Sequence, residues 1–357
     1  MTVTTGPDTA GLTGKQRRAE ARRLAEQRRN EPSSRGLPAV VVILGVVSLV
    51  ALVAGIALVT GFLTPTGTSV AGPVASARTV VRAESLSGVV VSDGSGWALD
   101  DQSGTVRRFD PSSGNWTGRA IHVGSYPVAV AAGYGKLWVA NSVSNDVVAV
   151  NPQSGRVVGA PVSVGQDPVS LAVGEGGVWV VSLQSDTVSL ISPLTRTVTA
   201  SVALPYGAVR VAVGDGAVWV TGATDTLARI SPKPVGVSLN WKAVRVGQTP
   251  IGLAVTPGAV WVGNLSSQTV TRVNPSRLRV TGTYAVPGDP DQIAVFDGRV
   301  WVGDGESGTL NALDPSTGRA DGRAVKLAGP VRALVVSGGT LWGNTANPAT
   351  LQAVVPS

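Results

Sequence analysis

The amino-acid sequence predicts an all-β fold, a seven-bladed β-propeller, from a repeated motif, its period and its composition. The motif PVSLAVGEGGVWV (residues 168–180) recurs along the chain, and its tryptophan returns at intervals of 41, 41, 40, 42, 40 and 41 residues. A fixed period near 40 residues marks a repeat architecture. The repeats are rich in valine, glycine and proline, which disfavour helices. The seven repeat tryptophans are Trp97, Trp138, Trp179, Trp219, Trp261, Trp301 and Trp342.

Each repeat is expected to form four short strands. In the repeat that contains Trp179, residues 170–173 and 178–181 are apolar runs on either side of a glycine-rich turn. A polar loop then leads to residues 187–191, and a Ser-Pro turn leads to residues 197–204. Short β-branched runs bounded by Gly, Pro, Ser and Asp are typical of strands. Four strands in about 40 residues are the pattern of a propeller blade, and we expect each tryptophan to fill the wedge between blades.

The two ends of the repeat region complement each other. The last repeat supplies strands at 331–336, near Trp342 and at 351–355, and then lacks a fourth strand. Residues 79–84 match a fourth strand that has no partners before it. The sequence therefore predicts that the ring closes with three strands plus one, which leaves only short, protected edges.

The repeat resembles the YVTN family of bacterial β-propellers. In that family a "YVAN"-like strand follows a "GxxPxxxAV" segment, and the equivalents here are WVAN at residues 138–141 and GQDP at residues 165–168. The repeat is also similar to the virginiamycin B lyase propellers. The resemblance covers residues 78–357. It implies the fold and leaves the function open, because propellers of this kind serve many tasks.

The region before the repeats predicts a membrane anchor. Residues 1–37 carry a net charge of +4 out of the chain's +7, and residues 38–62 are apolar and uncharged. Because a helix needs about 20 apolar residues to cross the bilayer, residues 38–62 are expected to span it. The basic flank on one side places residues 1–37 in the cytoplasm, where they can contact anionic lipid, and the propeller outside. This membrane role explains the arginines better than nucleic-acid binding does.

A cleaved signal peptide is the alternative interpretation of the same region. Residues 75–77 read Ala-Ser-Ala, which resembles a cleavage motif. However, the apolar run is longer than a signal peptide needs, and the motif lies well beyond its end. We therefore expect an uncleaved anchor, followed by a flexible linker at residues 63–77 and the propeller at residues 78–357.

The candidate ligand site is the mouth of the central channel. In a propeller, the loops that join one blade to the next share a face with the loops between the second and third strands. The second residue after each repeat's proline position is expected to line that mouth: Gly88, Ala129, Ser170, Arg210, Gly252, Gln292 and Arg332. The third residue after each tryptophan joins them: Asp100, Asn141, Ser182, Gly222, Asn264, Asp304 and, one place out of step, Asn344.

Two arginines among otherwise small or neutral residues favour an anionic or carbonyl-bearing ligand, because arginine binds such groups through two parallel hydrogen bonds. The alternative is structural. In that interpretation the asparagines and aspartates cap turns, and the arginines are solvated. The candidate ligand-binding residues are Arg210, Gln292, Arg332, Asp100, Asn141, Asn264 and Asp304.

Catalytic groups are scarce. The chain has no cysteine, and its single histidine, His122, is expected on an outer strand. The resemblance to the lyase propellers implies a histidine with a neighbouring glutamate, and no position matches that pair. The Asp and Asn residues of the mouth are spread around the ring, so no metal or cofactor is expected. The sequence thus favours a binding or scaffolding module over a lyase-like or lactonase-like enzyme.

Two further tryptophans, Trp116 and Trp241, lie outside the repeat register near outer strands. An exposed aromatic side chain there could contact a partner or a glycan. We expect local packing instead, because large aromatic side chains are mostly buried.

Overall fold

The computed structural model describes residues 76–83, 85–205, 207–233 and 239–355. The predicted basic tail, the apolar segment 38–62 and most of the predicted linker lie outside these residues. Within the described ranges, no helix is long and apolar enough to cross a membrane. The first strand, β1 (Ser76–Arg82), begins two residues before the predicted start of the propeller.

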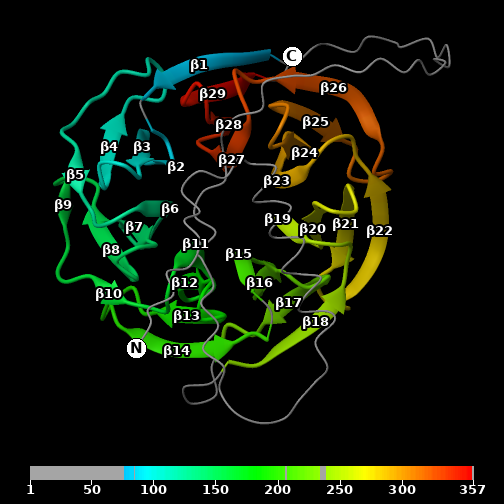
Figure 1. Ribbon diagram of the computed structural model, residues 1–357, viewed down its shortest axis with the longest axis horizontal. Helices are drawn as coiled ribbons and strands as arrows, with labels where there is room; N and C mark the ends of the chain where they lie inside the picture. Colours follow the sequence, from blue (N-terminus) through cyan, green and yellow to red (C-terminus); the bar gives the residue numbers. More distant parts are fainter. Residues whose placement is uncertain (1–75, 84, 206, 234–238, 356–357) are drawn as a thin grey trace, which may run out of the picture. The chain divides into compact units, whose positions relative to one another are not determined.

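Seven antiparallel sheets form a ring, which confirms the seven-bladed propeller (Figure 1). The innermost strand of each sheet contacts that of the next, and β27 contacts β2 to complete the circle. The innermost strands are β2 (Gly88–Ser92), β6 (Pro127–Gly133), β11 (Pro168–Gly174), β15 (Ala208–Gly214), β19 (Pro250–Thr256), β23 (Pro290–Phe296) and β27 (Val331–Ser337). We number the blades 1 to 7 in this order.

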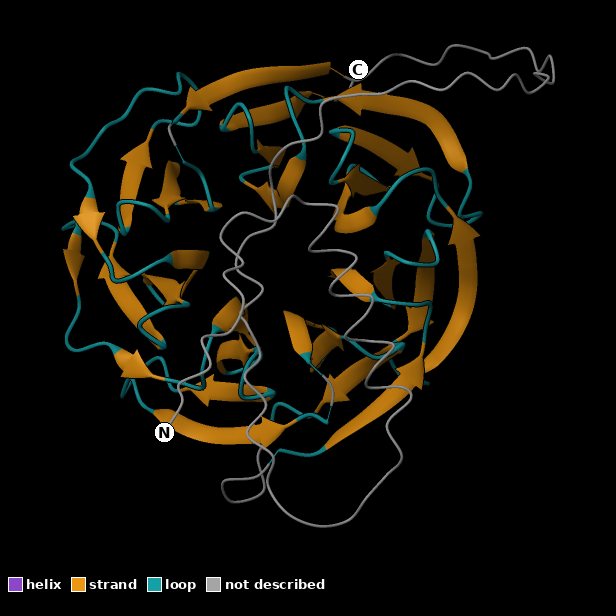
Figure 2. Cartoon of the chain, in the orientation of Figure 1, coloured by secondary structure: helices purple, strands orange, loops and turns teal. Residues whose placement is uncertain are grey.

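The second and third strands follow outward from the innermost strand, as Figure 2 shows. The second strands are β3 (Ser95–Asp100), β7 (Lys136–Asn141), β12 (Gly177–Ser182), β16 (Ala217–Gly222), β20 (Ala259–Asn264), β24 (Arg299–Asp304) and β28 (Thr340–Thr345). The third strands are β4 (Thr105–Phe109), β8 (Asp146–Asn151), β13 (Thr187–Ile191), β17 (Thr226–Ile230), β21 (Thr269–Asn274), β25 (Thr309–Leu313) and β29 (Thr350–Val355).

The outer strands vary most between blades. They are β5 (Ile121–His122) in blade 1, the two short pieces β9 (Arg156–Val157) and β10 (Val162–Ser163) in blade 2, β14 (Val198–Ala203), β18 (Trp241–Arg245), β22 (Arg279–Ala285) and β26 (Ala320–Lys326). In blade 7 the outer position belongs to β1, which pairs with β29 from Ser76 opposite Val355 to Arg82 opposite Thr350. The beginning and the end of the described chain therefore share one sheet.

The repeat tryptophans pack between blades, as expected. Trp138 of blade 2 lies in one apolar cluster with Leu171 and Val178 of blade 3. Its indole nitrogen donates a hydrogen bond to the carbonyl of Gly133, at the end of its own innermost strand, at 3.2 Å. Trp179, Trp219, Trp301 and Trp342 make the equivalent bond. Each of these five indoles is thus held by its own blade while it fills the gap to the next.

The two tryptophans outside the repeat register also have local packing roles, as expected. Trp116 meets Phe109 edge-on with ring centroids 6.1 Å apart, and the guanidinium of Arg107 lies 4.8 Å from its ring. Trp241 begins β18 and packs on the apolar cluster between blades 3 and 4.

Candidate functional site

The register of the innermost strands shows which side chains share a position near the mouth. Arg210 pairs with Thr221, and Gln292 pairs with Gly303, two residues after the repeat tryptophan in each case. In blade 7 the residue in this row is Ala333, which pairs with Asn344. Our assignment of Arg332 to the row was therefore wrong by one residue. One extra residue lies between Pro330 and Trp342, so counting from the proline gives a position one residue too early in the chain.

Arg332 instead occupies a β-bulge. The register of β27 against β28 shifts between Val331 and Ala333, which leaves Arg332 as the extra residue. In blade 6 the same shift leaves Asp291 in that position. The corresponding bulge residues of blades 2 to 5 are all aliphatic: Val128, Val169, Val209 and Ile251. Bulges redirect side chains and are common beside functional sites. Blades 6 and 7 thus carry charge where the other four bulges carry hydrocarbon.

Arg210 is a partly buried cation of the site. Its Nε is fully buried and has no hydrogen-bond partner among the described residues. Burial lowers the pKa of its guanidinium below the ordinary value, and the negative charge of Asp291 opposes that effect. A guanidinium carries five N–H donors in a fixed planar arrangement. Arg210 therefore carries a buried Nε–H donor that no described residue satisfies.

Gln292 shares the row of Arg210 two blades further round the ring, and only 6% of its surface is exposed. The residue between them in the row is Gly252 of blade 5, which has no side chain. A Cβ atom there would lie 3.0 Å from the carbonyl oxygen of Pro290, so a larger residue would fit poorly. Ser170 of blade 3 accepts a hydrogen bond from the backbone nitrogen of Val211 at 3.2 Å. The row thus contains two long polar side chains separated by a gap.

The asparagines of the predicted site are built into the loops. Asn141 is fully buried and donates to the carbonyl of Val123 at 2.9 Å. Asn264 accepts from the backbone nitrogen of Gly247 at 3.1 Å and donates to the hydroxyl of Thr271 at 2.9 Å. In both blades the amide ties the second strand to the loop that enters the blade. Their buried contacts match the structural alternative raised by the sequence.

The aspartates of the predicted site cap their own turns. One carboxylate oxygen of Asp100 accepts hydrogen bonds from the backbone nitrogens of Gln102 and Ser103, each at 3.0 Å. Asp304 does the same for Glu306 at 2.8 Å and Ser307 at 3.2 Å. The structure thus separates the candidates into turn-forming Asn and Asp residues and a channel group of Arg210, Gln292 and Arg332, to which the bulge adds Asp291.

Asp167 has a buried carboxyl group in the loop from blade 2 to blade 3 that the repeat pattern of the sequence does not single out. It has a left-handed backbone with φ of 55°, and only 5% of its surface is exposed. Its backbone nitrogen donates to Asn145 at 2.7 Å and its carbonyl accepts from Leu183 at 2.8 Å, so both flanking loops hold it. Burial raises the pKa of its carboxyl group. The Asp-Pro pair at residues 167–168 was the available signal, because it places a carboxylate just before an innermost strand.

The remaining chemistry is limited. His122 ends β5, the outer strand of blade 1, and is exposed. Among the residues that the structure describes, no three His, Cys, Asp or Glu side chains gather closely enough to hold a metal ion. The channel group itself contains two guanidinium groups, one amide and one carboxylate.

Solved structures with a similar fold are numerous. Virginiamycin B lyase from Staphylococcus aureus superposes with a TM-score of 0.66 at 13% identity, covering 77% of this chain and 96% of the lyase chain. A streptogramin B lyase gives 0.65 at 14% identity, covering 78% and 97%. The WD40 propeller domain of Doa1 gives 0.64 at 13% identity, covering 77% and 94%. No protein-family model and no curated protein matches the chain. At these identities the likeness establishes one thing, that the chain has the β-propeller fold.

Proposed function

We propose that the propeller is a binding module whose ligand presents a carboxylate or another anionic or carbonyl-bearing group to the channel mouth. The observation that carries the proposal is the buried Nε of Arg210, which has no hydrogen-bond partner in the described residues. A buried donor without a partner costs free energy. A bound anion would satisfy it through charge-assisted hydrogen bonds, which are the stronger kind.

The neighbouring groups would shape this recognition. The amide of Gln292 can donate and accept, so it suits a carbonyl or amide beside the anionic group. Asp291 and Arg332 would place opposite charges on adjacent bulges. The ligand would then need its anionic group near the arginines and away from Asp291, which favours specificity over simple charge attraction.

We also propose that the propeller is held outside the cell by residues 38–62, with residues 1–37 in the cytoplasm. The support is the uncharged apolar stretch with a basic flank on one side only. Protease added to intact cells should then digest the propeller while residues 1–37 survive. In this arrangement, closure of the ring by three strands plus one would keep the propeller intact next to its tether.

The competing function is an enzyme with a site at the mouth. It is favoured by fold similarity, since one of the similar structures is described as a catalytically inactive histidine variant of virginiamycin B lyase with quinupristin. The single histidine of this chain, His122, lies on an outer strand instead. We therefore favour binding. The first experiment is a thermal-shift screen of the full-length chain with small carboxylates and amides, repeated with Arg210→Ala.

A further inference from the structure

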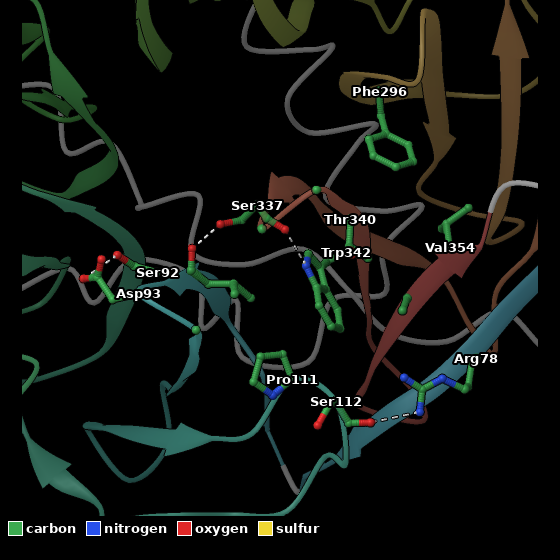
Figure 3. A pocket seen from close by; sticks show the side chains of 15 residues that line it. Arg78, Ser92, Asp93, Pro111, Ser112, Phe296, Ser337, Thr340, Trp342 and Val354 are labelled. Atoms are coloured by element: carbon green, nitrogen blue, oxygen red, sulfur yellow. Dashed lines mark hydrogen bonds between the residues drawn. The ribbon is translucent and has the colours of Figure 1, made fainter.

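A cavity of about 490 Å³ lies beside the turns between the first and second strands of blades 7 and 1 (Figure 3). In the antiparallel sheets these turns are at the opposite end of the strands from the loops of the mouth. Its walls include Arg78, Asp93, Phe296, Thr340, Trp342 and Ala353. It is a mixed pocket, with two aromatic side chains, aliphatic side chains and a few polar groups, as is usual for ligand sites. The repeat offers a direct way to infer what it accepts, because the position opposite the repeat tryptophan can be compared with that of the six other blades.

In three blades an arginine of the same blade fills that space. Arg108 of blade 1 pairs in register with Trp97, and its guanidinium carbon lies 5.9 Å from the centre of the indole ring. Its Nε donates to the hydroxyl of Ser95 at 2.9 Å. The same cross-strand pairs in blades 4 and 5 place guanidinium groups at 5.9 and 5.7 Å: Arg229 with Trp219, and Arg272 with Trp261. A cation over an indole ring is attracted by its electron-rich face.

Blades 3 and 6 fill the space differently. In blade 3 the residue paired with Trp179 is Leu190. Its side chain lies directly over Gly177, since a methyl group of Leu190 would be 2.2 Å from a Cβ atom placed on Gly177. In blade 6 the residue paired with Trp301 is Ala312, but Arg299, two residues before that tryptophan, forms an ion pair with Asp321 on the outer strand.

Blade 2 also has an alanine, Ala149, opposite its tryptophan. There Val158 of the same blade packs on the cluster that contains Trp138 and Ala149. Arg196 of blade 3 donates a hydrogen bond to the carbonyl of Val158, which adds a guanidinium to this blade boundary. Trp138 is fully buried as a result.

Blade 7 has a tryptophan and a hydroxyl group like those that surround Arg108 in blade 1, but it has no arginine at the position of Arg108. Trp342 pairs with Ala353, the position of Arg108 in blade 1. Thr340, two residues before Trp342, supplies a hydroxyl where blade 1 has Ser95. Trp342 is 4% exposed, the most of the seven repeat tryptophans. Arg78 lies across the strands from Ala353, yet its guanidinium donates to the carbonyl of Ser112 at 3.3 Å.

We propose that this cavity binds a guanidinium group from outside the fold, either the side chain of an arginine in a polypeptide or a small guanidinium compound. The group stacks on Trp342 and donates to the hydroxyl of Thr340, as Arg108 does with Trp97 and Ser95. Asp93, exposed on the wall that blade 1 contributes, supplies a negative charge. Arg78, on the outer wall, carries a positive charge that opposes the attraction of Asp93 for the guanidinium. This site is independent of the channel mouth.

The first test asks whether the space has the shape of an arginine. Ala353→Arg should leave the melting temperature of the full-length chain unchanged or raise it, because the new guanidinium finds the ring and hydroxyl that Arg108 finds. The matched control is Ala312→Arg in blade 6, where Arg299 and Asp321 already lie, and this variant should melt earlier. Equal destabilisation by the two substitutions would overturn the proposal.

The second test measures binding directly. Agmatine, which carries a guanidinium on a short aliphatic chain, is titrated into the full-length chain labelled at the tryptophan indole nitrogens. We expect a saturable shift of the Trp342 indole signal that is absent in Ala353→Arg. Thr340→Val should weaken binding by about tenfold, since it removes a hydrogen bond to a charged group. Asp93→Asn should weaken it, and Arg78→Ala should strengthen it.

Control ligands distinguish the chemistry and the source. Butylamine should bind more weakly than agmatine, because a compact ammonium lacks the planar face that stacks on indole. A blocked Gly-Arg-Gly peptide that binds more tightly than agmatine would identify a polypeptide as the natural source, and the reverse order would identify a small molecule. Binding of benzoate at the Trp342 signal without binding of agmatine would overturn the proposal and reassign the cavity to aromatic acids held by Arg78.

Discussion

Arg332 and Asp291 occupy the same structural position in neighbouring blades, where each is the extra residue of the bulge near the start of an innermost strand. The sequence does not align them, because Asp291 directly follows its repeat proline while Arg332 lies two residues after Pro330. The bulges of blades 6 and 7 thus carry opposite charges, outside the row that contains Arg210 and Gln292. The candidate site is therefore defined by strand register as much as by residue type.

The first prediction concerns the wedge between blades. Trp179 is fully buried in the cluster shared by blades 3 and 4, so Trp179→Ala should lower the free energy of unfolding by about 3–5 kcal/mol. Trp116→Ala should cost much less, because the side chain of Trp116 is partly exposed. Chemical denaturation of the two variants measures both values. A neutral Trp179→Ala would contradict the packing described here.

The second prediction concerns ring closure. A chain that begins at Ser85 lacks β1, so β29 would expose its whole outer edge, and Val81 would no longer cover the cluster around Trp342. Unpaired edges promote aggregation. We expect this chain to aggregate or melt early, whereas a chain that begins at Ser76 should fold. Equal melting temperatures for the two would show that β1 is dispensable.

The third prediction separates structural from ligand-binding roles among the asparagines. Asn264 is fully buried, and its amide bonds Gly247 and Thr271. Asn264→Ala should destabilise the fold by about 1–3 kcal/mol for each group left unpaired, with no ligand present. Denaturation curves of the free protein test this. If the variant keeps full stability and loses ligand binding, Asn264 belongs to the ligand site instead.

The fourth prediction concerns pH. Burial raises the pKa of Asp167, so the folded state favours the protonated carboxyl group more than the unfolded state does. The stability that this proton contributes is fully present when the pH is below the pKa of Asp167 in the unfolded state. It is lost as the pH rises through the pKa of Asp167 in the folded state. Asp167→Asn should therefore raise the melting temperature near neutral pH, and the difference should vanish as the pH falls below the ordinary value of 3.8. Asp215→Asn, in an exposed turn, is the control. An Asp167→Asn variant that melts earlier near neutral pH would show that the charge is stabilised.

The strands were predictable from the sequence because the apolar runs, the turn residues and the period agree. The strand expected at 187–191 is β13 with the same bounds, and the one expected at 197–204 is β14 (Val198–Ala203). The tryptophans marked the second strands without error, since a residue that fills the space between blades cannot shift along the strand.

The site was less predictable because its features depend on contacts between repeats. Asn141 and Asn264 look like possible ligands in the sequence, but only the fold shows their amides engaged by loops. Asp167 was overlooked, because burial and not residue type makes it unusual. The Arg–Trp pairs across neighbouring strands were missed for the same reason, since the two residues lie about ten positions apart in the sequence.

The most direct test of the binding function is the affinity of the full-length chain for N-acetylglycine, a carboxylate with a neighbouring amide, measured calorimetrically at low salt. We expect saturable binding that is weakened by about tenfold or more in the Arg210→Ala, Arg332→Ala double variant. Arg277→Ala, an exposed charge in a turn on the opposite face, should leave it unchanged. Unaltered affinity in the double variant, or a loss only from changes on the opposite face, would contradict the assignment of the ligand site to the channel mouth.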